Sequence, residues 1–203
     1  MDVSKTGILV EDCPDLVNFV RKDLDDILIN WGSQKIKCDA IYPSEDFCSK
    51  ESLERSKSEI NNSGDELRSS GMVNYHFNWR HFKLADKIGK YLKYKNIHGL
   101  KIGPRGCFKY TPEGGMSWHT NKEDPGVRVY FSFVQKEDGS FFRYQDPNTK
   151  EIVTSFDKGG WQARKFFIHS EPDKYLWHCV KSSNNRFSLG FGPKQDICNI
   201  SLL

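Results

Sequence analysis

The sequence predicts a mainly β protein with flanking helices and jelly-roll character, and two observations lead to this fold class. The first half of the chain carries amphipathic helical patterns. The second half carries short runs of Val, Ile, Phe and Tyr separated by Gly, Pro, Asn and Asp. A length of 203 residues is in the range of one domain with a substantial core. We expect one domain over 1–203, in which a mostly helical part, 1–98, packs on a β core, 99–203.

Two helices are expected in the N-terminal half. Pro14 opens a segment whose apolar residues recur at spacings of three and four, which predicts a helix over 15–31. A second apolar stripe predicts a helix over 79–94. Between them, residues 49–70 are charged and rich in Ser, which suits an exposed helix, a loop or a lid. We expect both helices to cover one face of a sheet.

About eight short strands are expected in the C-terminal half, a number that suits a sandwich or a barrel. Each is a β-branched or aromatic run bounded by turn residues. The expected strands are 100–110, 116–119, 127–134, 140–144, 151–156, 163–168, 175–180 and 186–191.

Composition limits the compartment. The longest apolar runs are too short to span a bilayer, and the N-terminus lacks the pattern of a secretory signal. The six cysteines form no CxxC pair, so free thiols are favoured over a disulfide framework. We therefore expect a cytoplasmic protein with no membrane partner.

Charge gives a weaker indication. The formal net charge of +3 is too small to indicate a nucleic-acid partner by itself. Basic residues are nevertheless concentrated over 87–105. A solvated helix face is the favoured interpretation of this segment, and a nucleic-acid partner stays open.

The chemistry is concentrated at two histidines and an arginine. His119 and Asn121 are two residues apart, so both side chains point to one face if the strand continues that far. His178 lies in the short strand pattern YLWHCV and is the candidate for a further ligand. Arg186 and Ser188 share a face of the next strand. An inward-facing arginine needs an anionic partner, because burial of an unpaired guanidinium is costly.

The order His119-Thr120-Asn121, then His178 57 residues later (178 − 121), then Arg186 and Ser188 resembles the 2-oxoglutarate and Fe(II)-dependent oxygenases. The resemblance covers about 103–192 and is closest to the prolyl-4-hydroxylase-like branch. It implies a double-stranded β-helix core of the cupin-like type. It also implies a dioxygenase, or hydroxylase, that uses dioxygen and couples oxidative decarboxylation of 2-oxoglutarate to oxidation of a substrate.

The resemblance also implies roles for individual residues. These are metal ligation and catalysis by His119, Asn121 and His178, binding of 2-oxoglutarate by Arg186, Ser188 and Tyr110, and substrate contacts by Arg128. Trp118 is expected in the core or in the pocket wall, and in the pocket wall it would contact the substrate. For Arg128, pairing with a structural acid such as Asp146 is an equal alternative.

Asn121 departs from the family pattern, which has Asp or Glu at this position. Asn121 is a neutral ligand, or Glu123 or Asp124 supplies the carboxylate, or the metal site is degenerate. The last case makes the protein a non-catalytic cupin-like binding module that holds an anion with Arg186 and Arg128. The sequence does not name the substrate. A peptidyl residue, prolyl first, is favoured by the branch resemblance, while a small molecule or a nucleobase stays open.

Overall fold

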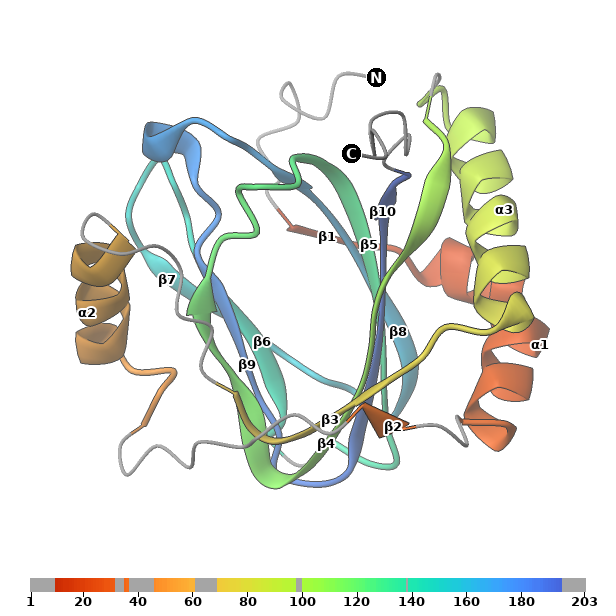
Figure 1. The fold of residues 1–203 in the computed structure, drawn as a ribbon, viewed down its shortest axis with the longest axis horizontal. Helices are drawn as coiled ribbons and strands as arrows, with labels where there is room; N and C mark the ends of the chain where they lie inside the picture. Colours follow the sequence, from red (N-terminus) through yellow and green to blue (C-terminus); the bar gives the residue numbers. More distant parts are fainter. Residues whose placement is uncertain are drawn as a thin grey trace, which may run out of the picture.

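Two curved β layers face one another and enclose the interior of the molecule, as Figure 1 shows. The structure is a computed structural model that describes residues 10–31, 35–36, 46–60, 69–97, 100–137 and 139–194. Its helices are α1 (Pro14–Ile29), α2 (Lys50–Ile60) and α3 (Trp79–Tyr94). The expected helices at 15–31 and 79–94 are thus confirmed to within two residues at each end.

The sheet contains ten strands within the described residues. They are β1 (Val10–Asp12), β2 (Lys35–Ile36), β3 (Ser69–Tyr75), β4 (Ile102–His119), β5 (Gly126–Val134), β6 (Phe141–Gln145), β7 (Ile152–Phe156), β8 (Gly160–Ile168), β9 (His178–Lys181) and β10 (Arg186–Pro193). Neighbouring strands pair antiparallel in the order β1-β8-β5-β10-β4-β9-β6-β7.

Strand β4 belongs to both layers. Its first part, 102–110, pairs with β10, and its last part, 115–119, pairs with β9. Between these two parts the strand changes direction near Glu113, which has a left-handed φ of 61°. Two separate strands, 100–110 and 116–119, were expected here, because the Thr-Pro-Glu-Gly-Gly sequence is typical of a loop. The continuous strand instead carries the chain from the large layer to the small one, and the result is a double-stranded β-helix, or jelly roll.

Helices α1 and α3 cover the outer face of the large layer, which is formed by β8, β5, β10 and the first part of β4 (Figure 1). The apolar stripe of α1 includes Leu16, Val20 and Leu24, all fully buried. These side chains pack in one cluster with Phe131 of β5 and Leu189 of β10. The expected packing of both helices on one face of the sheet is confirmed.

The N-terminal half also contributes strands that its sequence pattern does not indicate. Strand β1 extends the large layer beside β8, and β3 runs along β4. The segment 49–70 contains α2 and the start of β3, and its residues 61–68 lie outside the described residues. Leu53 of α2 is buried in a cluster with Trp118 and Trp177. The described part of this segment therefore packs on the small layer, and none of it lines the interior cavity.

The expected free thiols are found where the structure describes them. Cys13, Cys48, Cys107 and Cys179 are buried and free, while Cys38 and Cys198 lie outside the described residues. In the same part of the chain, no helix has the length and apolar character that a membrane span requires.

Candidate metal and anion site

A cavity of about 310 Å³ lies inside the barrel, between the two layers. Seven of the eight predicted site residues line it. They are His119, Asn121, His178, Arg186, Ser188, Tyr110 and Arg128. The fold thus collects, from four strands and one turn, side chains that are up to 78 positions apart in sequence (188 − 110).

His119 and His178 are directly opposite one another on the paired strands β4 and β9. Their ring centroids are 4.1 Å apart, and the side chains are buried. A β-bulge produces this pairing, because three steps along β4 from Met116 match two steps along β9 from Val180. The bulge turns His119 to the same face as Met116, and that face is the wall of the cavity.

Both imidazoles are held by a hydrogen bond at Nδ1. His119 Nδ1 lies 2.7 Å from the Ser117 carbonyl oxygen, and His178 Nδ1 lies 2.8 Å from that of Leu176. A carbonyl only accepts, so each Nδ1 carries the proton and donates it. Each Nε2 is left with a lone pair, as a metal-binding histidine requires. Burial, and secondarily the neighbouring His119, lowers the pKa of His178 well below its ordinary value, so that this ring is neutral.

Asn121 reaches the histidines from beyond the end of β4. Its φ of 55° is left-handed, a conformation that Asn adopts more readily than most residues. The strand therefore does not continue to Asn121 as expected, and the turn brings its side chain into the cavity. Its Nδ2 donates to His178 Nε2 at 3.2 Å and to the Tyr130 hydroxyl at 3.4 Å. A 180° rotation of the amide exchanges its nitrogen and oxygen. The oxygen then lies beside the two imidazoles, where it can serve as a third metal ligand.

Asp124, one of the two carboxylates considered as a replacement ligand, is held by arginines. Its Oδ2 lies 2.8 Å from Arg128 Nη2 and 2.9 Å from Arg105 Nε. The structural acid that pairs with Arg128 is therefore Asp124, and the expected alternative, Asp146, instead accepts hydrogen bonds from the turn at Asn148. Glu123 is exposed at the border of the cavity. In the part of the chain that the structure describes, no group of three or more His, Cys, Asp or Glu is placed to hold a metal ion.

Arg186 lies in a buried cluster with Asp157 and Arg164. Arg186 Nε donates to Asp157 Oδ2 at 2.6 Å, and Arg164 Nη1 donates to Asp157 Oδ1 at 2.8 Å. Burial alone would raise the pKa of Asp157. The opposing effect of Arg186, followed by that of Arg164, is larger, so the net shift is downward and the carboxyl is ionised. Two guanidinium groups against one carboxylate leave one positive charge in excess. Arg186 Nη1 is buried without a hydrogen-bond partner.

The remaining predicted anion-binding residues surround this cluster. The Arg186 guanidinium lies 5.7 Å from the centroid of the Tyr110 ring. Ser188 is on the same face of β10 as Arg186, and its register partner on β5 is Ser132, which also lines the cavity. This end of the cavity therefore combines an excess positive charge with hydroxyl groups, a combination suited to a carboxylate.

Trp118 requires a correction, since it was expected to contact the substrate. The residue is adjacent to His119 on β4, and adjacent strand residues face opposite sides of a sheet. Trp118 Nε1 donates to the Ser49 carbonyl at 2.8 Å, and the ring packs with Leu53 of α2. Trp118 is therefore part of the outer packing and does not line the cavity.

Residues that were not expected from the sequence also contribute to the site, among them Asp157, Arg164 and Tyr130. A signal existed for Arg164, because Gln162, Arg164 and Phe166 alternate with the helix-facing residues of β8. Asp157 lies in the connection between β7 and β8 and shows no pattern that distinguishes it from a surface residue.

No model of a known protein family matches the chain, and no curated protein matches it either. Solved structures that are similar to it include an oxidoreductase of the 2OG-Fe(II) oxygenase family from Burkholderia pseudomallei. The two sequences are 13% identical, the match covers 84% of this chain and 89% of that chain, and the TM-score is 0.46. A prolyl-4-hydroxylase from Pseudomonas putida has 13% identity, 95% coverage of both chains and a TM-score of 0.46. A prolyl hydroxylase from Trichoplax adhaerens, in complex with a hypoxia inducible factor peptide fragment, has 16% identity, 90% and 93% coverage and a TM-score of 0.44.

Proposed function

We propose that this protein is a 2-oxoglutarate- and Fe(II)-dependent oxygenase. The observation that carries the proposal is the presence, in one cavity, of two facing imidazoles whose Nδ1 atoms donate to backbone carbonyls and of a buried arginine cluster with one positive charge in excess. A non-haem iron centre that uses a keto acid needs the first feature for the metal and the second for the distal carboxylate. Side chains of this protein form both features.

The donor set fits Fe(II). His119, His178 and Asn121 would hold the metal, with two neutral nitrogens and one amide oxygen. The downward shift in the pKa of His178 favours this role, since a protonated imidazole does not bind a metal. The missing negative charge of a carboxylate would make the binding weaker than in a site with Asp or Glu at the third position.

The inner cluster fits 2-oxoglutarate. Arg186 would bind the distal carboxylate through Nη1, the atom left without a partner, while its Nε remains on Asp157. Ser188 would add a hydroxyl donor from the same face of β10. Asp157 and Arg164 touch no ligand in this scheme, and they act as positioning residues that fix the plane of the Arg186 guanidinium.

When bound, Fe(II) and 2-oxoglutarate supply the activation of dioxygen that oxidises a substrate. The chain's contribution is to position these groups and to exclude water. Phe142 packs 5.4 Å from the His178 ring centroid, and Tyr130 lies 6.4 Å from it, so the histidine is shielded on two sides. A peptidyl or prolyl substrate stays a prediction from the sequence resemblance.

A second candidate function is a binding module that holds an anion without a metal. The observation that favours it is the hydrogen bond from Asn121 Nδ2 to His178 Nε2, which satisfies the lone pair that a metal would use. In this case the arginines bind their ligand independently of His178.

The two functions differ in whether 2-oxoglutarate is consumed. The protein is supplied with Fe(II), 2-oxoglutarate and dioxygen, and succinate is measured by NMR. We expect succinate from the wild type and from the control His169→Ala, a histidine outside the cavity, and none from His178→Ala. Binding of 2-oxoglutarate without any succinate formation in the wild type would favour the second function. Equal succinate formation by His178→Ala would contradict the role of His178 as a metal ligand.

A further inference from the structure

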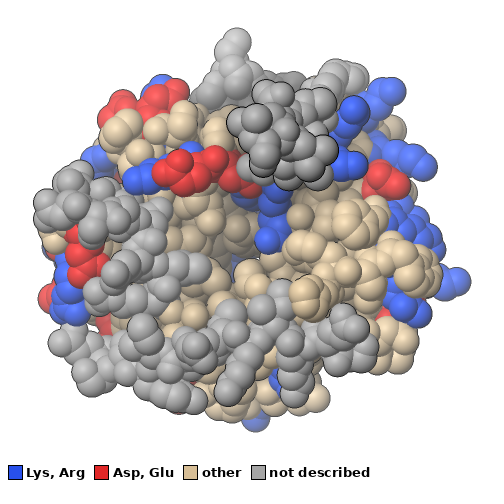
Figure 2. Space-filling model, viewed as in Figure 1, with Lys and Arg blue, Asp and Glu red and all other residues tan. Residues whose placement is uncertain are grey.

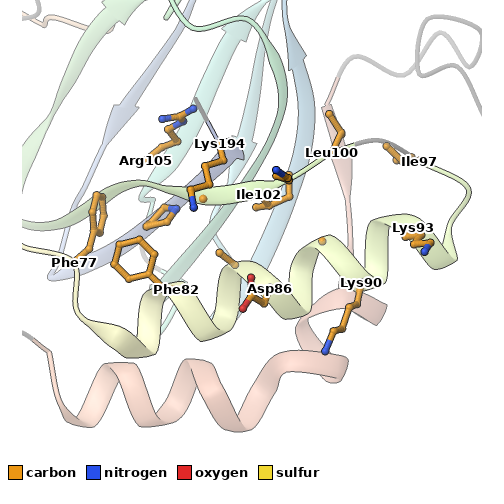
Figure 3. Close-up of a pocket in the computed structure, with 15 residues that line it drawn as sticks. Phe77, Phe82, Asp86, Lys90, Lys93, Ile97, Leu100, Ile102, Arg105 and Lys194 are labelled. Carbon is orange, nitrogen blue, oxygen red and sulfur yellow. The ribbon is translucent and has the colours of Figure 1, made fainter. Parts of the chain in front are cut away.

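A second hollow lies outside the barrel, between α3 and the first part of β4, and Figure 3 shows its lining. Its volume is about 710 Å³. Gly89, in the middle of α3, lets the helix approach β4 closely, because a Cβ built there would lie 3.8 Å from Ile102 Cγ1. Glycine in a helix interior costs about 1 kcal/mol relative to alanine, so the sequence of α3 accepts a less stable helix where the groove runs.

The groove is strongly cationic. Five basic side chains and one acidic side chain line it, whereas the whole chain carries a net charge of only +3. The basic residues are Lys90, Lys93, Lys101, Arg105 and Lys194, and the acidic residue is Asp86. Figure 2 shows Lys and Arg gathered on the side of the molecule where α3 lies in Figure 1. The four lysines are exposed, and within the described residues none of them has an ion-pair partner.

Two aromatic rings lie among these charges. Phe77 is 37% exposed and Phe82 is 52% exposed, so both rings are accessible from solvent. In Figure 3 both rings lie at the end of the groove where Arg105 and Lys194 are found. Exposed rings beside cations form a surface on which planar bases stack while phosphates meet the charges.

Arg105 connects the groove to the catalytic cavity, since it lines both. Its guanidinium shares Asp124 with Arg128, so two positive charges again meet one negative charge. Arg128 is almost completely buried, and its Nη1 has no hydrogen-bond partner. Glu123 is exposed at the same border, so the guanidinium and carboxylate groups there are equal in number. What the boundary offers an anionic chain is the unsatisfied donor Arg128 Nη1.

We propose that this groove binds single-stranded nucleic acid and that the strand enters the cavity past Arg105 as the substrate. The inference rests on the proposed function for the statement that the strand is a substrate. Single strands are favoured over duplexes, because Phe77 and Phe82 can stack only on bases that are free of a partner strand. An acidic peptide would use the lysines and leave the rings without a role.

Binding is tested by fluorescence anisotropy with labelled single strands of about 12 nucleotides, using the full chain without added metal or keto acid. We expect binding that weakens with salt, so that log affinity falls with log salt concentration. The double variant Lys101→Glu, Lys194→Glu should make this fall less steep by roughly 1.4 in slope. The control Lys22→Glu, Lys136→Glu changes the same charge at exposed lysines that do not line the groove, and it should keep the slope.

Two further variants separate stacking and shape from charge. Phe82→Ala should weaken binding about ten-fold, while Phe156→Ala, a ring of similar exposure on β7, should not. Gly89→Leu fills the groove with a better helix former and should also weaken binding while α3 stays folded.

Absence of binding, equal loss in the control variants, or equal affinity for a duplex, a mononucleotide or an oligoglutamate peptide would overturn the inference. These outcomes are independent of the proposed function. If the protein forms an iron and keto acid complex but binds no oligonucleotide, only the proposal for the groove fails. If it binds an oligonucleotide but forms no such complex, only the proposed oxygenase function fails.

Discussion

Arg186 Nε and Asp157 Oδ2 are 2.6 Å apart, and both side chains are almost completely withdrawn from solvent. The arginine predicted to bind a ligand thus has an internal anionic partner as well. Since Arg164 shares that partner, the pair does not neutralise the cavity. Asp157 instead fixes the guanidinium in one orientation and leaves its Nη1 for a ligand.

Replacing Asp157 should destabilise the fold. Asp157→Asn leaves two buried guanidinium groups without a counter-charge, and we expect a loss of about 3–5 kcal/mol in the free energy of unfolding. Urea denaturation measures this change. The control Asp173→Asn, at an exposed turn position, should leave stability unchanged, and an equally small effect at Asp157 would contradict the positioning role.

The contribution of Asp157 should also depend on pH. Its pKa in the folded protein is below the ordinary value of 3.8, so its stabilising effect is present above pH 3.8 and is lost as the pH falls through the lowered folded value. The stability difference between the wild type and Asp157→Asn should therefore be constant above pH 3.8 and shrink below it. A difference that stays constant in acid would show that the carboxylate charge is not involved.

Arg186→Lys should weaken the binding of 2-oxoglutarate. Lysine keeps the charge but cannot hold Asp157 and a ligand carboxylate through two fixed nitrogens, so the half-saturating concentration should rise about ten-fold or more. Calorimetric titration of the iron-loaded protein measures it. Arg143→Lys is the control, since Arg143 contacts Thr154 and the Cys48 carbonyl and lies outside the cavity. Equal effects of the two variants would argue against a specific role for Arg186.

Asn121→Asp should strengthen the metal site. Aspartate tolerates the left-handed backbone of Asn121, and its carboxylate adds the negative charge that the site lacks. We expect the affinity for Fe(II) to rise about ten-fold or more, as measured by anaerobic calorimetry. Asn148→Asp, which adds the same charge at an exposed turn, should have no effect. Weaker iron binding by Asn121→Asp would show that Asn121 is not at a metal-binding position.

Trp118→Phe should leave the binding of 2-oxoglutarate unchanged. The ring packs outside the barrel, and the substitution removes its hydrogen bond to the Ser49 carbonyl. We expect a loss of about 1 kcal/mol in the free energy of unfolding, measured by denaturation alongside ligand titration. A change in ligand affinity at wild-type stability would place Trp118 at the cavity after all.

The sequence was informative about the elements that local pattern determines. Periodicity identified the helices that became α1 and α3, and the HxN, His and ArgxSer spacing identified side chains that converge in one cavity. It could not identify the bulge between Met116 and His119, because register depends on the partner strand. For the same reason the Asp157 cluster was missed, since its three members come from a connecting segment and two strands that meet only in the fold.

The central claim is tested most directly by anaerobic titration of the protein with Fe(II) and 2-oxoglutarate, followed by visible absorption. A chelated iron and keto acid complex gives a weak charge-transfer band, so no substrate is required. We predict that the band forms in the wild type, is lost in His178→Ala and needs more 2-oxoglutarate in Arg186→Lys. A folded wild-type protein that binds 2-oxoglutarate but forms no band would contradict the assignment of His119, Asn121 and His178 as an iron site.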